Sequence, residues 1–393
     1  MNIKVSQLSN AIRFLSIDAV QKANSGHPGM PMGMADVATV LFKFHLRFNP
    51  KNPSWINRDR FILSAGHGSM LLYSLLYLTG YEKIKLEDIK NFRQLNSICA
   101  GHPEYIYNSG IETTTGPLGQ GLANSVGLAI ASEIYKKKFG TKIINHKTYV
   151  IASDGDLMEG ISHESMSLAG HLKLKNLIVF FDNNKISIDG STSLSVSDNY
   201  KKRFESYGWN FIEINGHNEK QINAAIKKAN KSNKPTLISC KTVIGFGSPN
   251  KSGKSSSHGS PLGEDEIKLV RKKLNWSHLP FEIPEDILTE WRQIGAKGEN
   301  LEKDWLKELN KSRANIKENF NQFNNKIYRD KLNELITLEK EKYFKEKPEM
   351  ATRQCSMKVI ELLNNLMPNL VGGSADLSGS NNTKTSNSII FNS

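Results

Sequence analysis

Two polar sites follow apolar runs and carry oxygen ligands of the kind that hard metal ions bind. Asp154 follows the run Tyr149-Val-Ile-Ala, and Asn184 follows the run Leu177-Ile-Val-Phe-Phe. In a parallel sheet ligands bind outside the carboxyl ends of the strands, so a βαβ unit would bring both side chains to one edge. Mg²⁺ takes few protein ligands plus phosphate oxygens, and these two residues with the carbonyl of Ile186 therefore suit a metal-diphosphate site. The alternative is that the aspartate caps a helix and the asparagine lies in a turn.

A glycine-rich segment, Gly116-Pro-Leu-Gly-Gln-Gly, stands directly before a helical pattern from Leu122 to Phe139. Glycines at a helix N-terminus let backbone N–H groups approach an anion. The segment does not match the dinucleotide fingerprint G-x-G-x-x-G, and a purely structural turn remains the alternative.

Four of the ten histidines lie in loops of small residues, where an imidazole can face a ligand. They are His27, His67, His102 and His258. A neutral imidazole both donates and accepts near pH 7, which suits proton transfer around the hydroxyl and carbonyl groups of a sugar. For any one of them alone, a hydrogen-bonded structural histidine is the alternative, and we assign His171 and His217 to structure.

Arg353 and Ser380 are two further candidates, for binding a phosphate. An arginine offers a planar fork that matches phosphate oxygens, and a serine hydroxyl adds a neutral donor. The alternative is a surface arginine and a serine in a turn.

The elements that must position these residues follow from periodicity. Between residues 148 and 241, short apolar strands alternate with helical patterns, which predicts an α/β fold with a buried parallel sheet. Residues 264–347 are charged and helical in pattern, typical of peripheral helices and a linker. A helix is expected from near Met350, followed at Asn369-Leu-Val-Gly-Gly-Ser-Ala-Asp by the first strand and loop of another α/β domain.

Composition excludes several classes of protein. The 393 residues carry a net charge of +13, which favours anionic partners, although a solvated lysine-rich surface explains most of it. Three scattered cysteines indicate neither a disulfide framework nor a zinc site. Because there is no signal-like or long apolar run and no interleaved basic and aromatic motif, we expect a cytoplasmic protein that binds neither membrane nor nucleic acid.

The motifs resemble those of the N-terminal part of transketolase, a thiamine-diphosphate enzyme of sugar-phosphate metabolism. The resemblance runs from about residue 8 to about residue 384. Its carriers are Lys22-Ala-Asn-Ser-Gly-His-Pro-Gly, Leu63-Ser-Ala-Gly-His-Gly-Ser-Met-Leu, Thr113-Thr-Thr-Gly-Pro-Leu-Gly-Gln-Gly, Ser153-Asp-Gly-Asp-Leu-Met-Glu-Gly-Ile-Ser-His-Glu, Asn183-Asn-Lys-Ile-Ser-Ile-Asp-Gly and Thr242-Val-Ile-Gly-Phe-Gly-Ser-Pro-Asn-Lys. One departure is Ser153, where many relatives have glycine.

The resemblance implies a role for each site residue. Mg²⁺ or Ca²⁺ would be held by Asp154, Asn184 and Ile186, and thiamine diphosphate by His67, Gly116, Pro117, Leu118, Asp154, Gly155, Glu159, Asn184, His258 and Asp376. His27, His102 and His258 would be catalytic, and His27, His258, Arg353 and Ser380 would bind the sugar phosphate. Glu159 and Glu164 would join a network at the interface of a homodimer, and Asp376 would reach the cofactor bound mainly by the partner subunit.

The implied activity is transfer of a two-carbon ketol group from a ketose phosphate to an aldose phosphate. The resemblance implies a diphosphate- and metal-binding domain over residues 1–315, a helical linker over 316–347 and an incomplete pyrimidine-binding domain over 348–393. A glutamate that the family uses to activate the cofactor would lie beyond residue 384, so we expect negligible turnover by these 393 residues alone. The alternatives are a non-catalytic cofactor-binding or assembly remnant, one half of a split enzyme, and the related synthase that joins pyruvate to glyceraldehyde phosphate.

Overall fold

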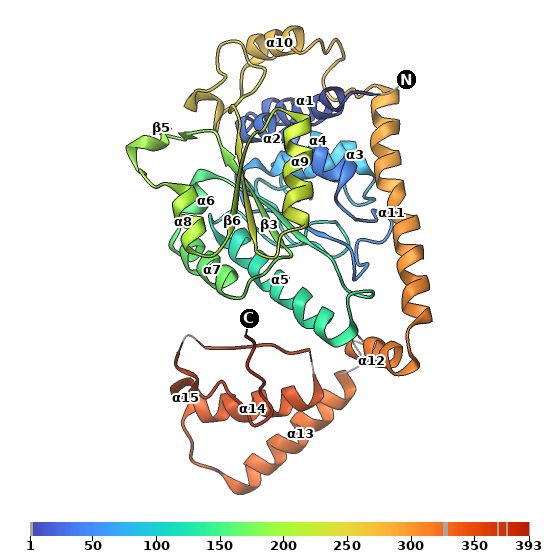
Figure 1. Ribbon diagram of the computed structural model, residues 1–393, viewed down its shortest axis with the longest axis vertical. Coiled ribbons are helices and arrows are strands. Elements are labelled where there is room, and N and C mark those ends of the chain that lie inside the picture. The colour runs from blue at the N-terminus through green and yellow to red at the C-terminus, as the bar shows by residue number, and fades with distance from the viewer. Residues whose placement is uncertain (1–2, 325–328, 368, 375, 393) are drawn as a thin grey trace. The chain divides into compact units, whose positions relative to one another are not determined.

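The computed structural model describes residues 3–324, 329–367, 369–374 and 376–392. The chain forms two compact units, Met1–Glu308 and Leu309–Ser393, which are described separately (Figure 1). The predicted linker at 316–347 includes residues 325–328, which lie outside the described residues.

The first unit is built on a parallel sheet of five strands in the order β1-β2-β3-β7-β6. Its strands are β1 (Arg60–Leu63), β2 (Thr148–Ala152), β3 (Leu177–Asn183), β6 (Asn210–Asn215) and β7 (Thr236–Lys241). The predicted α/β parallel sheet is therefore confirmed, with one more strand, β1, than the apolar pattern after residue 148 indicated. A short antiparallel hairpin, β4 (Ile186–Ser187) with β5 (Gly190–Ser191), follows β3.

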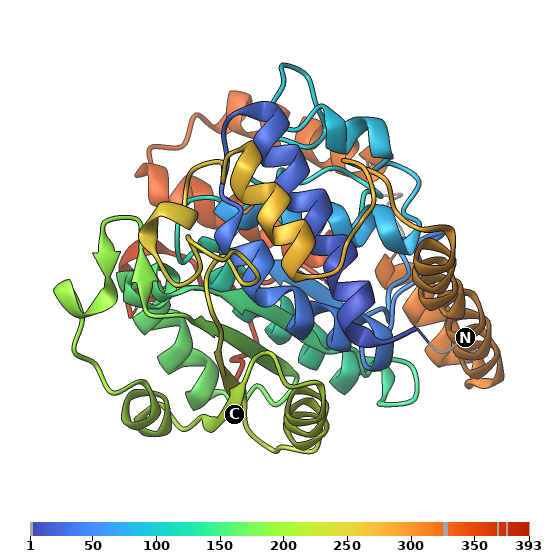
Figure 2. The ribbon, with the colours of Figure 1, turned by 90° about the horizontal axis from the view of Figure 1, so that it is seen from above.

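Helices cover both faces of the sheet (Figure 2). Successive side chains of a strand point to opposite faces of the sheet, and both faces are covered. The strands β2 and β3 are therefore apolar at nearly every position and contribute side chains to two separate cores. Tyr149 and Ile151 join the first core, whereas Val150 and Ala152 join the second. The first core includes α1 (Val5–Ala23), α2 (Gly29–Phe44), α3 (Ser69–Thr79), α4 (Leu86–Lys90), α9 (Glu219–Asn230) and α10 (Glu264–Lys273), and the second α5 (Gln120–Phe139), α6 (Asp154–Met158), α7 (Gly160–His171) and α8 (Tyr200–Ser206).

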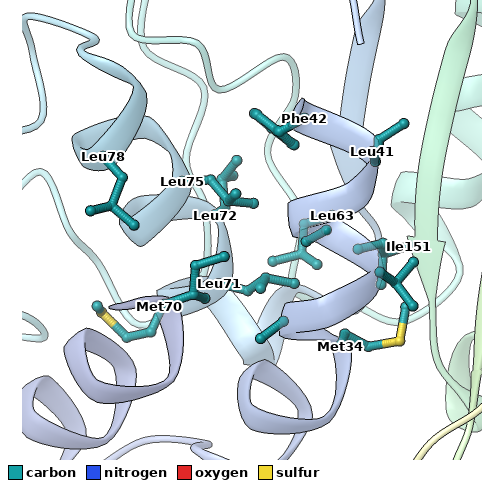
Figure 3. Packing of buried hydrophobic residues seen from close by; sticks show 14 of the residues in the cluster. Met34, Leu41, Phe42, Leu63, Met70, Leu71, Leu72, Leu75, Leu78 and Ile151 are labelled. Atoms are coloured by element: carbon teal, nitrogen blue, oxygen red, sulfur yellow. The ribbon is translucent and has the colours of Figure 1, made fainter. Parts of the chain in front are cut away.

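Part of the first core lies where α2 and α3 meet the sheet (Figure 3). Met34 and Leu41 from α2 and Leu71 from α3 approach Leu63 of β1 and Ile151 of β2 there. All five side chains are nearly inaccessible to water. This layer fixes the carboxyl ends of β1 and β2, from which the loops of the site emerge.

Helix α11 (Glu285–Lys311) begins in the first unit and packs on it through two glycines. A Cβ on Gly295 would lie 2.0 Å from the carbonyl oxygen of Thr79, and one on Gly298 would lie 2.0 Å from that of Phe48. The Trp291 indole N–H donates to the carbonyl of Leu8 at 3.3 Å, and Glu302 accepts from side chains of the loop after α2. The charged region after residue 264 therefore begins with a helix that is part of the first unit.

The second unit consists of helices in its described part: α12 (Ala314–Asn324), α13 (Arg329–Glu346), α14 (Thr352–Leu366) and α15 (Ser378–Asn381). The helix expected from near residue 350 is α14. The strand expected after residue 369 is not formed among the described residues, because a strand needs a neighbour for its backbone groups and the described part of this unit offers none. In the described ranges, no helix is both long and apolar enough to span a bilayer.

Candidate functional site

The carboxyl ends of β2 and β3 bring the two proposed metal ligands to one edge of the sheet. These strands are adjacent and parallel, with Ala152 opposite Phe181. Asp154 begins α6 just after β2, and Asn184 directly follows β3. Within α6 it is Ser153, and not Asp154, that caps the helix, by accepting from the backbone N–H of Asp156. The capping role that the sequence left open for Asp154 is therefore filled by its neighbour.

Asp154 has the environment of a carboxylate that binds a cation. It is 4% exposed, and both of its oxygens are buried without a hydrogen-bond partner. Burial, and then the nearby Asp182, raise the pKa of Asp154 to about 7. The charge and backbone N–H of Lys185 and the hydroxyl of Tyr200 face the carboxylate without hydrogen-bond geometry and act in the opposite direction. Buried carboxylate oxygens with no donor are costly unless a cation neutralises them, so the residues fit a divalent metal ion.

Asn184 lies in the same polar cluster. Its amide nitrogen donates to Asp182 at 2.8 Å, and its amide oxygen accepts from the backbone N–H of Ile186 at 2.9 Å. The second contact is the turn that the sequence offered as the alternative, and the oxygen's second lone pair is still available to a metal. Among the described residues, no three or more His, Cys, Asp or Glu side chains form a metal-binding group. A metal here would therefore rely on amide, carbonyl and phosphate oxygens beside Asp154.

The glycine-rich segment lies beside this cluster. Gly119 has a φ of 79°, in the region that favours glycine, and it is the N-cap of α5. The N–H of Gly119 donates to Asp156 at 2.8 Å. Leu118 packs closely on Gly155, because a Cβ added to Gly155 would lie 2.8 Å from Cδ1 of Leu118. The glycine-rich segment and the N-terminus of α5 therefore lie next to the proposed metal site, and the positive end of the helix favours an anion such as a diphosphate there.

Asp156 ties the three segments of the site together, a role that the sequence pattern did not suggest. It is fully buried and accepts hydrogen bonds from the Ser64 hydroxyl, the Gly119 N–H, and the N–H and hydroxyl of Ser153. Ser64 follows β1, Gly119 precedes α5 and Ser153 follows β2. One carboxylate thus holds the ends of two strands and the glycine-rich turn in a fixed relation.

Three of the four predicted histidines form a triangle at the same end of the sheet. The ring centroids of His27 and His67 are 5.2 Å apart, those of His67 and His258 are 5.2 Å apart, and those of His27 and His258 are 5.7 Å apart. The fourth histidine, His102, packs against the glycine-rich segment, since a Cβ added to Gly116 would lie 3.1 Å from the Cβ of His102. The structure therefore brings these histidines to the glycine-rich segment.

The histidines are held neutral. Burial, and then the neighbouring histidines, lower the pKa of His67 to about 3. Burial, followed by His258, Arg93 and His102, lowers that of His27 to about 4, and burial also lowers the pKa values of His102 and His258. The Nδ1 atom of His258 is buried without a partner. Neutral imidazoles can pass protons to and from sugar oxygens at neutral pH.

His217, which the sequence assigned to structure, supports the loop that carries His258. Its Nδ1 lies 2.9 Å from Asp36, which also binds Arg13 at 2.6 Å. Because its Nε2 accepts from the backbone N–H of Val243 at 3.1 Å, the histidine anchors the start of the segment that leads to His258. Sequence reasoning gave no sign of this buried chain of contacts.

The remaining predicted residues are exposed. Glu159, between α6 and α7, lies against the glycine-rich segment, since a Cβ on Gly119 would lie 2.9 Å from its Cβ, and Glu164 lies on α7. Three further predicted residues are exposed and belong to the second unit. They are Arg353 on α14, Asp376 before α15, and Ser380 on α15.

Comparisons with known proteins identify the family of the chain. The family model for transketolase, thiamine diphosphate binding domain, matches residues 4–332. A transketolase of Rhodobacter capsulatus is 52% identical over 380 residues, covering 97% of this chain and 56% of its own length. Among solved structures, the transketolase of Campylobacter jejuni has a TM-score of 0.86 at 43% identity over 98% of this chain and 59% of that one. A Pichia stipitis transketolase in complex with sedoheptulose 7-phosphate has a TM-score of 0.84 at 40% identity, over 98% of this chain and 57% of that one.

The fold and the polar edge define a thiamine-diphosphate-binding α/β domain. The chain belongs to the transketolase family, and it spans somewhat more than half the length of the relatives that it matches.

Proposed function

We propose that the first unit binds thiamine diphosphate through Mg²⁺ or Ca²⁺, and that the whole protein transfers a two-carbon ketol group from a ketose phosphate to an aldose phosphate. The observation that carries the proposal is the pair of buried, unpartnered oxygens of Asp154. The next two residues, Gly155 and Asp156, contact Leu118 and Gly119 of the glycine-rich segment, so partners for a cation and for a diphosphate lie close together.

In this proposal each segment has a distinct task. Asp154, Asn184 and the carbonyl of Ile186 would bind the metal ion. The cofactor's diphosphate and thiazolium would be surrounded by His67, Gly116, Pro117, Leu118, Gly155 and His258. Bound thiamine diphosphate supplies the carbon nucleophile and electron sink of the reaction. His27, His102 and His258 hold and transfer protons at the sugar's hydroxyl and carbonyl oxygens, and their low pKa values keep them neutral for this work.

The substrate class and the assembly are also proposals. The Pichia stipitis relative is seen with a sugar phosphate, and the fork of Arg353 with the hydroxyl of Ser380 suits such a phosphate. A homodimer, with Glu159 and Glu164 at its interface and Asp376 reaching toward the cofactor of the partner subunit, is the expected whole assembly. The cytoplasmic location, the absence of nucleic-acid and membrane binding, the domain limits and the low turnover of residues 1–393 alone stay predictions.

A donor-specific assay of the whole protein tests the activity. With thiamine diphosphate and Mg²⁺, we expect a ketose phosphate and an aldose phosphate to be consumed and two new sugar phosphates to appear, with no release of carbon dioxide. Pyruvate consumed in the presence of glyceraldehyde phosphate would instead identify the related synthase. No turnover with either donor, from protein shown to bind the cofactor, would support a non-catalytic binding protein.

A further inference from the structure

One cation faces the histidines of the site and has no task in the proposed function. Arg93 lies in the loop after α4, and its Nη1 donates to the Ser25 hydroxyl at 2.8 Å. Its Nη2 lies 3.4 Å from Nδ1 of His27. Its Nε is buried without a partner, 3.1 Å from the place that a Cβ on Gly101 would occupy, next to His102. The guanidinium thus lies between the loops of two predicted catalytic histidines.

The chemistry of this contact fixes the proton on His27. A guanidinium has five N–H donors and no acceptor, and it keeps its charge in proteins. The Nδ1 atom of His27 must therefore accept, so in the neutral ring the proton is on Nε2. That atom lies 3.3 Å from the position of a Cβ on Gly259, beside His258, and it has no hydrogen-bond partner among the described residues.

We propose that Arg93 is a positioning residue that holds His27 as the neutral tautomer with its proton on Nε2, ready to donate to an oxygen of the sugar substrate. The inference rests on the proposed function for the substrate, whereas the tautomer itself depends only on the contact between the two side chains. A missing side-chain carbon at Gly259 leaves room for that oxygen.

The surrounding charges act in the same direction. The groups that face His27 are His67, His102, His258 and Arg93, and none of them is an anion. The positive charge of Arg93 opposes a second positive charge on His27 and lowers its pKa, and it lowers that of His102 too. Burial and His258 lower the pKa of His27 more than Arg93 does, so Arg93 sets the position of the proton on His27 and adds to the effects that keep the ring neutral.

Nuclear magnetic resonance of the chain labelled with ¹⁵N in its histidines tests the inference without cofactor or substrate. His27 is assigned from the signals lost in His27→Gln. Above the ordinary histidine pKa of about 6.5, we expect Nδ1 of His27 to be unprotonated and Nε2 to carry the proton. In Arg93→Gln the new side chain can donate or accept, so the other tautomer should appear and the titration midpoint of His27 should rise.

Two variants serve as controls. Arg93→Lys keeps a charged group that can only donate, and it should keep the tautomer and the low midpoint. Arg292→Gln removes a half-buried arginine that lies over Tyr77 instead, and it should leave the His27 signals unchanged. A protonated Nδ1 in the unmodified chain, or unchanged His27 signals in folded Arg93→Gln, would overturn the inference. Failure of the chain to bind thiamine diphosphate would contradict the proposed function and leave this result standing.

Discussion

At the scale of single residues, the site depends on polar groups that are buried in unusual states. Asp154 lacks donors, Asp156 has four, and the histidines are uncharged. Each state has a physical cause in the loops that meet at the edge of the sheet, and each gives a measurable consequence.

The substitution Asp156→Asn should weaken the junction of the three loops. An amide cannot accept all four hydrogen bonds, because its nitrogen is a donor, so at least one buried N–H or hydroxyl loses its partner at a cost of about 1–3 kcal/mol. Urea unfolding should show this loss in the free energy of unfolding. Asp265→Asn, at an exposed carboxylate of α10, is the matched control and should stay within about 0.5 kcal/mol of the unmodified chain. Equal stabilities of the two variants would contradict the role given to Asp156.

The neutral histidines should make stability depend on pH. The folded pKa of His67 is about 3, below the ordinary value of 6.5, so the unfolded chain binds the proton first. This contribution is complete above the unfolded pKa of about 6.5 and is lost as the pH falls toward the folded value, with a slope of at most about 1.4 kcal/mol per pH unit. Asp154 and Asp182 have raised pKa values and change the stability in the opposite direction as the pH falls. The test therefore compares the pH dependence of a variant without His67 with that of the unmodified chain.

That difference is measured by chemical unfolding at several pH values below neutrality. The slope of the unfolding free energy against pH should be smaller in His67→Gln than in the unmodified chain. Identical slopes would show that His67 takes up a proton as readily in the folded protein as in the unfolded chain, which would contradict its lowered pKa.

At the scale of elements, the apolar strands and the helical periods were sufficient to predict the parallel sheet and the edge where Asp154 and Asn184 lie. The glycine loops were enough to select the histidines that meet. Arg93, Asp156 and the partners of His217 could not be predicted, because their contacts join segments that are far apart in the sequence. Strand β1 was missed since its four residues include a charged one and follow no clear alternation.

Helix α11 gives a prediction at this scale. In Gly298→Ala the added Cβ would lie 2.0 Å from the carbonyl oxygen of Phe48, so the helix must shift, and overpacking of this kind costs about 1–3 kcal/mol. Gly127→Ala is a matched control on α5, where nothing lies within 4 Å, and it should raise stability by up to about 1 kcal/mol. The unfolding free energies should therefore move in opposite directions. A Gly298→Ala variant that is as stable as the unmodified chain, or more stable, would mean that α11 does not pack this closely.

At the scale of the whole molecule, the proposed activity depends on the polar edge of the sheet being a binding site for a metal ion with a diphosphate. The family assignment rests on the match over residues 4–332, and the relatives are longer than this chain. The first unit nevertheless contains the proposed metal ligands, the glycine-rich turn and the four histidines, so its cofactor binding can be measured on the 393 residues directly.

Isothermal titration calorimetry with thiamine diphosphate, in the presence and absence of Mg²⁺, tests this claim most directly. We predict binding that requires the metal and that weakens by more than about tenfold in Asp154→Ala, since a metal ligand matters at least as much as the groups that support one. Asp265→Asn should bind as the unmodified chain does. Folded protein that gives no metal-dependent binding heat, or Asp154→Ala with unchanged affinity, would contradict the account.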